Sequence, residues 1–476
     1  MQTFRSIQLW ATITALSLAP LFFGSVDRSW IAIWTVVLSI SVLCGAVARR
    51  MGASQRRVVY TFLAVCSVYA IVAAIQIAPD FMTKLNDPIW QRTSKLLDTN
   101  LPMRISSRAE IPPVAIGHFV LVVTAFLSGF LVGTSRRDSD ILSGVARYSI
   151  LFYAIYGLFA LAFTPNLLLW APKTAYVGSF TASFVNHNTA AAFVGVGAIL
   201  WLCLAFSTLQ SLTFSSVRLL LLTRANEQVA FKLILRSAAG LCCFFALLLS
   251  SSRGGLICSC LGLLIAVGLI VVGRNKSGFW CIFGLVGVVA AATFGWLTHM
   301  GRIGSEGLFD SGRWSVYGYC IEIIRERPLL GTGLGTFGDF FPSVRGTDLS
   351  SLGVWDYAHS TILEIAVEMG IPVAAMIAIA AIASTYILLR ATLRSKDRSR
   401  SSFAAMTGIS ILAYLHSIID FSLQIPGFFI VFWILTGNWL ARSLEEESAT
   451  RRTGAPRFTE LKSTGEVDRP VGVVAL

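Results

Sequence analysis

Residues 310–335 read DSGRWSVYGYCIEIIRERPLLGTGLG, and residues 355–368 read WDYAHSTILEIAVE. Both segments belong to the stretch from Leu297 to Glu368, which is the one long polar interlude in a sequence made of apolar runs. Because the runs on either side have the length and character of buried helices, we predict that this stretch carries the polar site of the protein. The surrounding helices are expected to hold it in place.

The composition of the chain is that of a membrane protein. Of its 476 residues, 55% are hydrophobic and 13% are charged, and the mean hydropathy is +0.71. A water-soluble domain does not tolerate that balance. Apolar runs of about 18 to 22 residues recur along the chain, and each is long enough to cross a hydrocarbon core of about 30 Å. The predicted fold class is therefore an all-α polytopic membrane protein.

About twelve transmembrane spans are predicted from apolar windows bounded by charges, glycine or proline. They lie near 7–23, 30–47, 58–78, 114–133, 145–163, 185–207, 233–251, 254–273, 279–297, 360–389, 403–421 and 425–441. An even number places both termini on one side, and most of the 38 Lys and Arg fall on that side, as the positive-inside rule expects for the cytoplasm. Topology thus explains the net charge of +13, and no nucleic-acid partner is expected.

The remaining segments complete the expected organisation. Residues 1–441 form the transmembrane domain, with a long outer loop at 298–359 between the ninth and tenth spans. Residues 442–476 are charged and poor in aromatic residues, which predicts a disordered cytoplasmic tail. A short helix is predicted over 89–97, and the basic, Leu-rich segment 210–236 is predicted to form an amphipathic helix at the lipid surface.

Arg253 stands near the middle of an apolar stretch that is too long for one span. The sequence Ser250-Ser-Ser-Arg-Gly-Gly255 at this point predicts a hairpin with Arg253 at its outer tip. A charge at bilayer depth is costly, so such a residue normally faces a polar cavity or a ligand. The planar guanidinium suits phosphate oxygens. The alternative is an arginine that snorkels to the outer interface.

Arg313 opens a segment with helical spacing that ends before Pro328. Asp310-Ser-Gly312 in front of it supplies capping residues, so the amides of the first turn can add to an anion site. The alternative is a surface helix whose arginine pairs with Asp310 or Glu322.

Two further motifs resemble nucleotide-binding signatures but do not fit them. The segment Gly331 to Gly338 contains a G-x-G-x-x-G pattern, yet no strand pattern precedes it, so a tight turn that lets a lipid or backbone approach closely is expected. Asp138-Ser-Asp140 imitates the D-x-D of nucleotide-sugar transferases and is predicted to be a solvated loop.

His359 lies at the outer mouth of the predicted tenth span, and a histidine is well suited to accept a proton from a hydroxyl near neutral pH. Glu364 and Glu368 follow on the same helix and share a face, so either can orient His359 or pair with an arginine. Pro372 predicts a kink one turn deeper. The alternative for His359 is an interfacial histidine with a structural hydrogen bond.

The other polar residues near the outer side are expected to line a shared cavity. They are Asn186-His187-Asn188 at the start of the sixth span, His416 with Asp420 on the eleventh, and Tyr357. The five histidines of the chain all fall toward this side, but no two have the spacing of metal ligands. Neither a metal nor a cofactor is therefore expected.

The order of these features resembles the O-antigen ligase and polymerase superfamily, the bacterial membrane transferases of lipid-linked glycans. The segments that carry the resemblance are Phe184-Val-Asn-His-Asn188, Ser252-Arg-Gly-Gly255, Gly312-Arg-Trp314 through Pro328-Leu-Leu-Gly-Thr-Gly-Leu-Gly335, and His359 through Glu368-Met-Gly370. Their combination is far more specific than any one of them.

The resemblance implies a GT-C-like fold and an inverting, metal-independent glycan transfer. The donor would be an undecaprenyl-diphosphate glycan, and the acceptor hydroxyl would lie on the periplasmic side of the bacterial inner membrane. Arg253 and Arg313 would bind the diphosphate, and His359 would activate the acceptor. The remaining substrate-binding candidates are Asn186, His187, Asn188, Tyr357, Glu364 and Glu368.

The resemblance also leaves the acceptor open. Lipid A core would be the acceptor of a ligase, which we favour, and a growing glycan would be the acceptor of an O-antigen or exopolysaccharide polymerase. A transporter or flippase of a lipid-linked glycan is the alternative from a different class, because twelve spans also suit such a protein. The polar residues gather on the outer side instead of the midplane, and the two halves look unlike, which disfavours transport.

Overall fold

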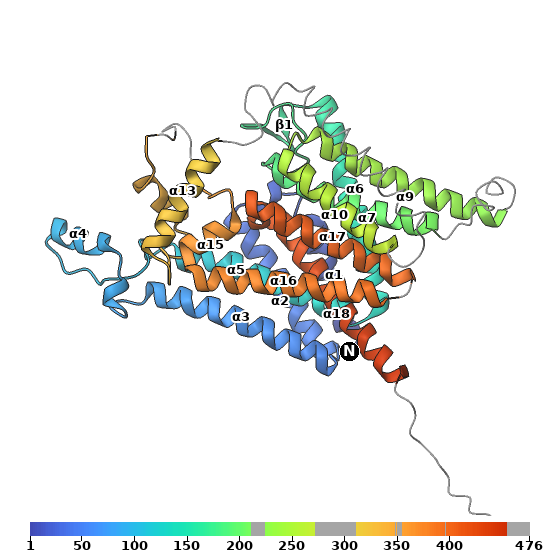
Figure 1. Ribbon diagram of the computed structural model, residues 1–476, viewed down its shortest axis with the longest axis horizontal. Helices are drawn as coiled ribbons and strands as arrows, with labels where there is room; N and C mark the ends of the chain where they lie inside the picture. The colour runs from blue at the N-terminus through green and yellow to red at the C-terminus, as the bar shows by residue number, and fades with distance from the viewer. Residues whose placement is uncertain (211–223, 272–310, 348, 350–354, 396, 455–476) are drawn as a thin grey trace, which may run out of the picture.

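The computed structural model describes residues 1–210, 224–271, 311–347, 349, 355–395 and 397–454. Within these residues, ten helices are long and apolar enough to cross a membrane, which confirms an all-α polytopic membrane protein (Figure 1). They are α2 (Arg28–Ala48), α3 (Ala53–Ile77), α5 (Pro112–Gly133), α6 (Arg136–Phe163), α7 (His187–Gln210), α9 (Arg224–Leu249), α10 (Arg253–Val271), α16 (Ile371–Arg394), α17 (Asp397–Ile419) and α18 (Pro426–Gly454).

Shorter elements complete the described fold. The helical ones are α1 (Gln2–Leu18), η1 (Phe23–Ser25), η2 (Thr83–Leu85), α4 (Pro88–Leu97), α13 (Ser311–Glu326), α14 (Phe337–Phe340), η3 (Phe341–Ser343), α15 (Thr361–Met369) and η4 (Ser422–Gln424). The strands β1 (Leu167–Leu168) and β2 (Ala171–Pro172) form a small antiparallel hairpin. Helix α4 confirms the short helix predicted over 89–97, and α13 confirms the helix predicted to end before Pro328.

Three boundaries differ from the predicted spans or fall beyond the described residues. The predicted span at 279–297 lies outside the described residues, as do residues 211–223 of the predicted amphipathic segment. The last helix, α18, continues to Gly454, so the predicted tail at 442–476 begins inside a helix. Residues 455–476 of that tail also lie outside the described part of the chain.

The predicted span at 360–389 is two helices, α15 and α16, with Gly370 between them. Gly370 has φ +84°, and a Cβ at this position would lie 2.2 Å from the carbonyl oxygen of Leu329, so only glycine fits. Pro372 consequently lies in the first turn of α16, where its missing N–H costs no helical hydrogen bond. The prediction of one kinked helix was wrong, because the break comes from Gly370 and not from Pro372.

Contacts between helix termini show which termini lie at the same end of the bundle. At one end Asp138, in the first turn of α6, pairs with Arg49 at 2.5 Å and with Arg5 at 3.7 Å. Gln55 at the start of α3 donates to the carbonyl of Ala441 at the same end. The prediction of a solvated loop at Asp138-Ser-Asp140 was therefore wrong, because a buried arginine holds the first carboxylate.

The opposite end is called the site end below. Here α9 and α17 end, and α7, α10 and α18 begin. The amide of Phe180 donates to the carbonyl of Leu249, and Asn188 in the first turn of α7 donates to Asp420, directly after α17. In Figure 1, α13 and α15 lie at the left, whereas the N-terminus and the C-terminal part of α18 lie toward the lower right.

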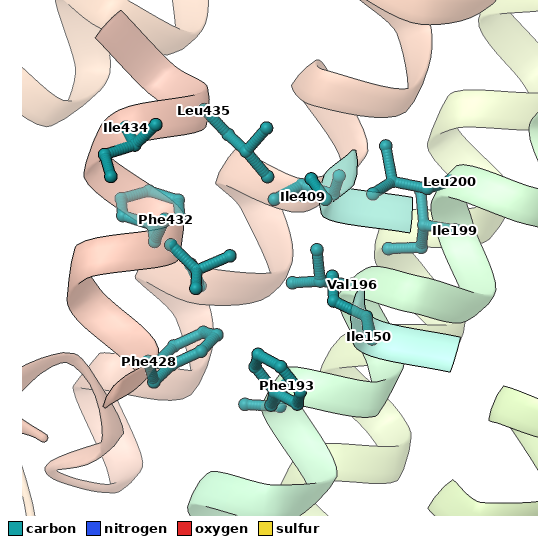
Figure 2. Close-up of a cluster of buried hydrophobic side chains, with 14 of the residues drawn as sticks. Ile150, Phe193, Val196, Ile199, Leu200, Ile409, Phe428, Phe432, Ile434 and Leu435 are labelled. Carbon is teal, nitrogen blue, oxygen red and sulfur yellow. The ribbon is translucent and has the colours of Figure 1, made fainter. Parts of the chain in front are cut away.

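Two deeply buried helices, α7 and α18, lie at the centre of the bundle. Figure 2 shows how side chains from α6, α7, α17 and α18 meet in the core, among them Ile150, Phe193, Ile409 and Phe432. Neighbouring helices approach closely through glycines, as is typical where lipid supplies no hydrophobic driving force between helices. A Cβ at Gly262 of α10 would lie 2.5 Å from the carbonyl oxygen of Gly408 on α17.

This crossing of α10 and α17 gives a stability prediction, since both helices end or begin at the site. We expect Gly262→Ala to lower the stability of the protein by about 1–3 kcal/mol, because the added methyl group forces the helices apart. Gly268, on the same helix, has no atom within 4 Å of an added Cβ, so Gly268→Ala serves as the matched control. Thermal unfolding in detergent, followed by size-exclusion chromatography, measures both; equal melting temperatures for the two variants would contradict the packing argument.

Candidate functional site

Asp420 lies at the centre of a polar cluster at the site end. Its side chain is 1% exposed, and it follows the last residue of α17. The carboxylate accepts hydrogen bonds from Asn188 Nδ2 at 2.8 Å and from Ser422 Oγ at 2.8 Å. Because a buried carboxylate is stable only when it is paired and hydrogen-bonded, these contacts fix the position of a negative charge at this end of the bundle.

Arg313 reaches this cluster from α13. Its Nη1 donates to the carbonyl of Ile419 at 2.8 Å, and its Nη2 lies 3.8 Å from Asp420 Oδ2. The α17 carbonyls point out of the helix end, and a cation is favoured there. With 27% of its side chain exposed, the guanidinium is anchored on one side and accessible on the other.

His359 approaches the same carboxylate oxygen from the segment before α15. Its Nδ1 lies 4.0 Å from Asp420 Oδ2, beyond hydrogen-bond distance, and has no hydrogen-bond partner in the described part of the chain. The side chain is 22% exposed. The imidazole and the Arg313 guanidinium therefore lie within 7.8 Å of each other, the sum of their distances to that oxygen.

The backbone at His359 adopts an uncommon conformation, with φ +53°. Two side chains hold it there: Tyr317 OH donates to the His359 carbonyl at 2.9 Å, and Glu364 Oε2 accepts the Ala358 amide at 2.7 Å. The ring lies edge-on against Phe421, with 4.9 Å between the centroids. Strained backbone persists only where the surroundings determine it, and it is common at functional sites.

Arg253 comes to the cluster from the first residue of α10, at the predicted hairpin between α9 and α10. Its neighbour Gly254 packs on the end of α17, where an added Cβ would lie 2.7 Å from Ile419 Cδ1 and 3.8 Å from His416 Cδ2. Ile419 is the residue whose carbonyl binds Arg313. The fold thus brings Arg253, Arg313 and His359 to the same helix end.

The Asn186-His187-Asn188 segment caps the start of α7 beside this cluster. Asn186 Oδ1 accepts the amide of Asn188, and the Asn188 side chain binds Asp420. His187 Nδ1 lies 2.8 Å from the carbonyl oxygen of Ser250, in the hairpin that carries Arg253. Tyr357 contributes through its ring, which stacks on Phe421 at 4.4 Å.

Glu364 and Glu368 are both buried and serve backbone groups. Glu364 binds the amide next to His359, whereas Glu368 accepts the amides of Gly335 at 2.8 Å and Phe337 at 3.0 Å. Burial raises the pKa of both carboxyl groups, and the charge of Glu368 raises that of Glu364 further. The two glutamates, of which either was predicted to orient His359 or pair with an arginine, thus hold the backbone around α15.

The glycine-rich turn wraps the end of α15, as the expectation of a close backbone approach required. Gly331 has φ +63°, and a Cβ there would lie 2.4 Å from the carbonyl oxygen of Val367. Gln76 near the end of α3 locks the turn: it donates to the carbonyls of Leu330 and Glu368 and accepts the amide of Leu334. The protein's own backbone therefore occupies the space next to these glycines.

The charges of the cluster keep Asp420 ionised. Burial alone would raise the pKa of its carboxyl group, but the neighbouring His359, His416, Ser422 and Arg313 side chains, in that order of effect, lower it to about 2. The carboxylate is therefore charged throughout the physiological range. Among the described residues, no group of three or more His, Cys, Asp or Glu side chains has the arrangement of a metal site.

Residues 238–378 match the O-antigen ligase family. This part of the chain is similar to the O-antigen ligase and polymerase superfamily. This confirms the predicted resemblance and supports a ligase or polymerase type of function, with a lipid-linked glycan and an acceptor as substrates in a membrane. No curated protein matches the chain.

The O-antigen ligase segment contains Arg253, Arg313 and His359 but not two central residues of the polar cluster. Asn188 and Asp420 lie outside residues 238–378, and the fold brings them to the site from α7 and the end of α17. Asp420 was expected only to line a cavity. A carboxylate directly after an apolar span, four residues beyond His416, was the signal in the sequence that pointed to a larger role.

Proposed function

We propose that this protein transfers a glycan from undecaprenyl diphosphate to an acceptor hydroxyl at the site end of the bundle, with inversion at the anomeric carbon and without a metal ion. Lipid A core is the acceptor that we favour, which makes the protein an O-antigen ligase. One observation carries the proposal: Arg313 and His359 meet around the buried charge of Asp420 at the end of α17, and Gly254, next to Arg253, packs on the same helix end.

The two arginines would bind the diphosphate of the donor. Negative charge grows on the departing diphosphate as the glycosidic bond breaks, so fixed guanidinium groups stabilise the transition state more than the ground state. Arg313 suits this role because the Ile419 carbonyl and Asp420 hold it in place while part of its side chain remains accessible. A guanidinium group binds two phosphate oxygens at once, and its positive charge would replace that of a metal ion.

His359 would take the proton of the acceptor hydroxyl. The acceptor oxygen attacks the anomeric carbon, the bond from that carbon to the diphosphate oxygen breaks, and the hydroxyl proton passes to the imidazole. The strained backbone, the Tyr317 and Glu364 contacts and the edge-on Phe421 ring fix the orientation of this imidazole. Asp420 Oδ2 lies 4.0 Å from His359 Nδ1, and its negative charge stabilises the imidazolium that forms.

The site end would face the periplasm of a bacterial inner membrane. The opposite end carries arginines such as Arg5 and Arg49, and Arg390 and Arg394 at the end of α16, as expected for cytoplasmic ends of helices. A lipid-linked diphosphate donor would then reach the arginines from the outer leaflet.

The role of Asp420 can be tested with a variant of the same shape. We expect Asp420→Asn to reduce the rate of transfer about tenfold to a hundredfold, because a neutral amide cannot stabilise the two cationic groups as a carboxylate does. Initial rates in nanodiscs measure the effect. Asp339→Asn, which changes a carboxylate paired with the exposed Arg108, is the matched control. A folded Asp420→Asn variant with the wild-type rate would remove Asp420 from the site.

One reconstitution experiment distinguishes lipid A core from a growing glycan as the acceptor. Purified protein in nanodiscs receives an undecaprenyl-diphosphate glycan, together with lipid A core in one sample and with additional donor alone in another. Glycosylated core identifies a ligase, and a longer glycan on the carrier lipid identifies a polymerase. The absence of both products, with the protein folded, would overturn the proposed transfer.

A further inference from the structure

A small cavity lies in the connection between α6 and α7, at the site end. It has a volume of about 180 Å³, and its lining includes Phe23, Leu168, Lys173, Thr174, Thr181 and Val185. Pockets for drug-sized ligands occupy about 300–1,000 Å³, so this cavity suits a single sugar unit or its charged substituent and not a lipid.

The connection that forms the cavity contacts residues beside the polar cluster around Asp420. Tyr176, three residues after Lys173, stacks on His187 with 4.0 Å between the ring centroids. The amide of Phe180 donates to the carbonyl of Leu249, and His187 Nδ1 contacts the carbonyl of Ser250, both in the hairpin before Arg253. A group bound in the cavity would therefore lie on a segment that contacts the hairpin carrying Arg253.

Two polar side chains in the cavity have hydrogen-bonding capacity that the described structure does not use. Thr181 is 2% exposed, and its Oγ1 has no hydrogen-bond partner in the described part of the chain. A buried hydroxyl in that state is unfavourable unless a ligand binds it. Lys173 Nζ donates to the Ser179 carbonyl at 3.0 Å, and an ammonium group carries three N–H donors.

The charge of the cavity selects an anion. Lys173 brings a positive charge, and none of the described lining residues is a carboxylate. Burial lowers the pKa of the Lys173 ammonium, since the charged form has lost part of its hydration. A bound anion would compensate for that loss.

Phe23 contributes an aromatic ring to the lining of the cavity. Phe23 packs edge-on against Trp170, with 5.1 Å between the centroids, and Trp170 remains 71% exposed. Phe23, Gly24 and Ser25 all have positive φ, at +52°, +72° and +55°. This strained stretch turns the Phe23 ring toward the cavity, and such rings offer the flat apolar surface that the carbon-bound face of a sugar can cover.

We propose that this cavity binds an acidic sugar unit of one of the two glycan substrates, with Lys173 on its carboxylate or phosphate group and Thr181 on a hydroxyl. The site rests on the proposed transfer function, since it would hold the sugar next to the reacting glycan. The anionic unit belongs either to the donor glycan or to a phosphorylated acceptor core, and the two sources can be separated by experiment.

The first experiment compares the wild type with Lys173→Met in nanodiscs, using charged and neutral versions of each substrate. The donors carry either a hexuronic acid or the matching neutral hexose, and the acceptor cores are either phosphorylated or enzymatically dephosphorylated. We expect Lys173→Met to raise the KM of one substrate about tenfold in its anionic form only, with kcat within about twofold of the wild type. The affected substrate identifies the source of the anion.

Three further variants test whether the change in KM comes from the proposed contacts. Thr181→Val preserves the shape of the side chain and should raise the same KM, whereas Lys173→Arg should restore it. Lys95→Met, at an exposed lysine of α4, should match the wild type. Equal KM values for wild type and Lys173→Met with all substrates would overturn the site, as would equal losses on the anionic and neutral forms.

A binding measurement separates failure of the site from failure of the proposed function. Ligand-observed NMR on the protein in nanodiscs uses D-glucuronate, D-glucose 6-phosphate and D-glucose as probes. We expect one or both anionic sugars to bind more tightly than glucose, and Lys173→Met to abolish the preference. A preference without any transfer product would overturn the proposed function and support the site; product without a preference would overturn the site alone.

Discussion

His359→Asn is expected to lower the initial rate of glycan transfer at least about a hundredfold, because a general base contributes about 10²–10⁴ to a rate and asparagine cannot accept the proton. Asparagine is the chosen replacement because it tolerates the left-handed backbone, which this position adopts at φ +53°. The contacts of Tyr317 and Glu364 to the backbone around residue 359 should therefore survive. Single-turnover assays in nanodiscs give the rate of the chemical step.

The control for this variant is His118→Gln, on a histidine of α5 that contacts Phe429 and has no part in the cluster. It should keep the wild-type rate. Monodisperse elution and an unchanged melting temperature establish that His359→Asn is folded. A folded His359→Asn protein with the wild-type rate would exclude this histidine from proton transfer.

Arg313→Lys is the second substitution with a large expected effect. Lysine keeps the positive charge but not the fork, so one group can no longer bind the Ile419 carbonyl and face Asp420 while presenting N–H donors to the diphosphate. Loss of one preorganised donor to a developing charge costs about 10²–10³ in kcat, and we expect a loss in that range. The donor KM should change less, because the contact strengthens in the transition state.

Arg325→Lys provides the matched control for this substitution. Arg325 is exposed near the end of the same helix, α13, so the exchange should leave both kcat and KM unchanged. A smaller than threefold change in kcat for Arg313→Lys would mean that charge alone suffices at this position. In that case the fork geometry would have no role in stabilising the departing diphosphate.

Much of the architecture could be predicted from local patterns. Apolar runs long enough to cross a bilayer, the hairpin at Ser250–Ser252 and the short helix at 88–97 depend on residues close together in sequence, and the structure has all three. The break at Gly370 was misassigned because Pro372 is the stronger helix-breaking signal in a sequence. Only the approach of the Leu329 carbonyl shows that Gly370 is the residue that must be glycine.

The resemblance to the O-antigen ligase and polymerase superfamily, which the match over residues 238–378 supports, and the candidate arginines and histidine followed from the order of residues along the sequence. Their assembly did not. Asp420 lies 61 positions beyond His359 and 232 beyond Asn188, and no local pattern pairs them. The sequence by itself determined which elements cross the membrane, because hydrophobicity and spacing act over short distances. Only the tertiary structure decided that a buried carboxylate joins Arg313, His359 and Asn188, because that arrangement depends on which helix ends meet.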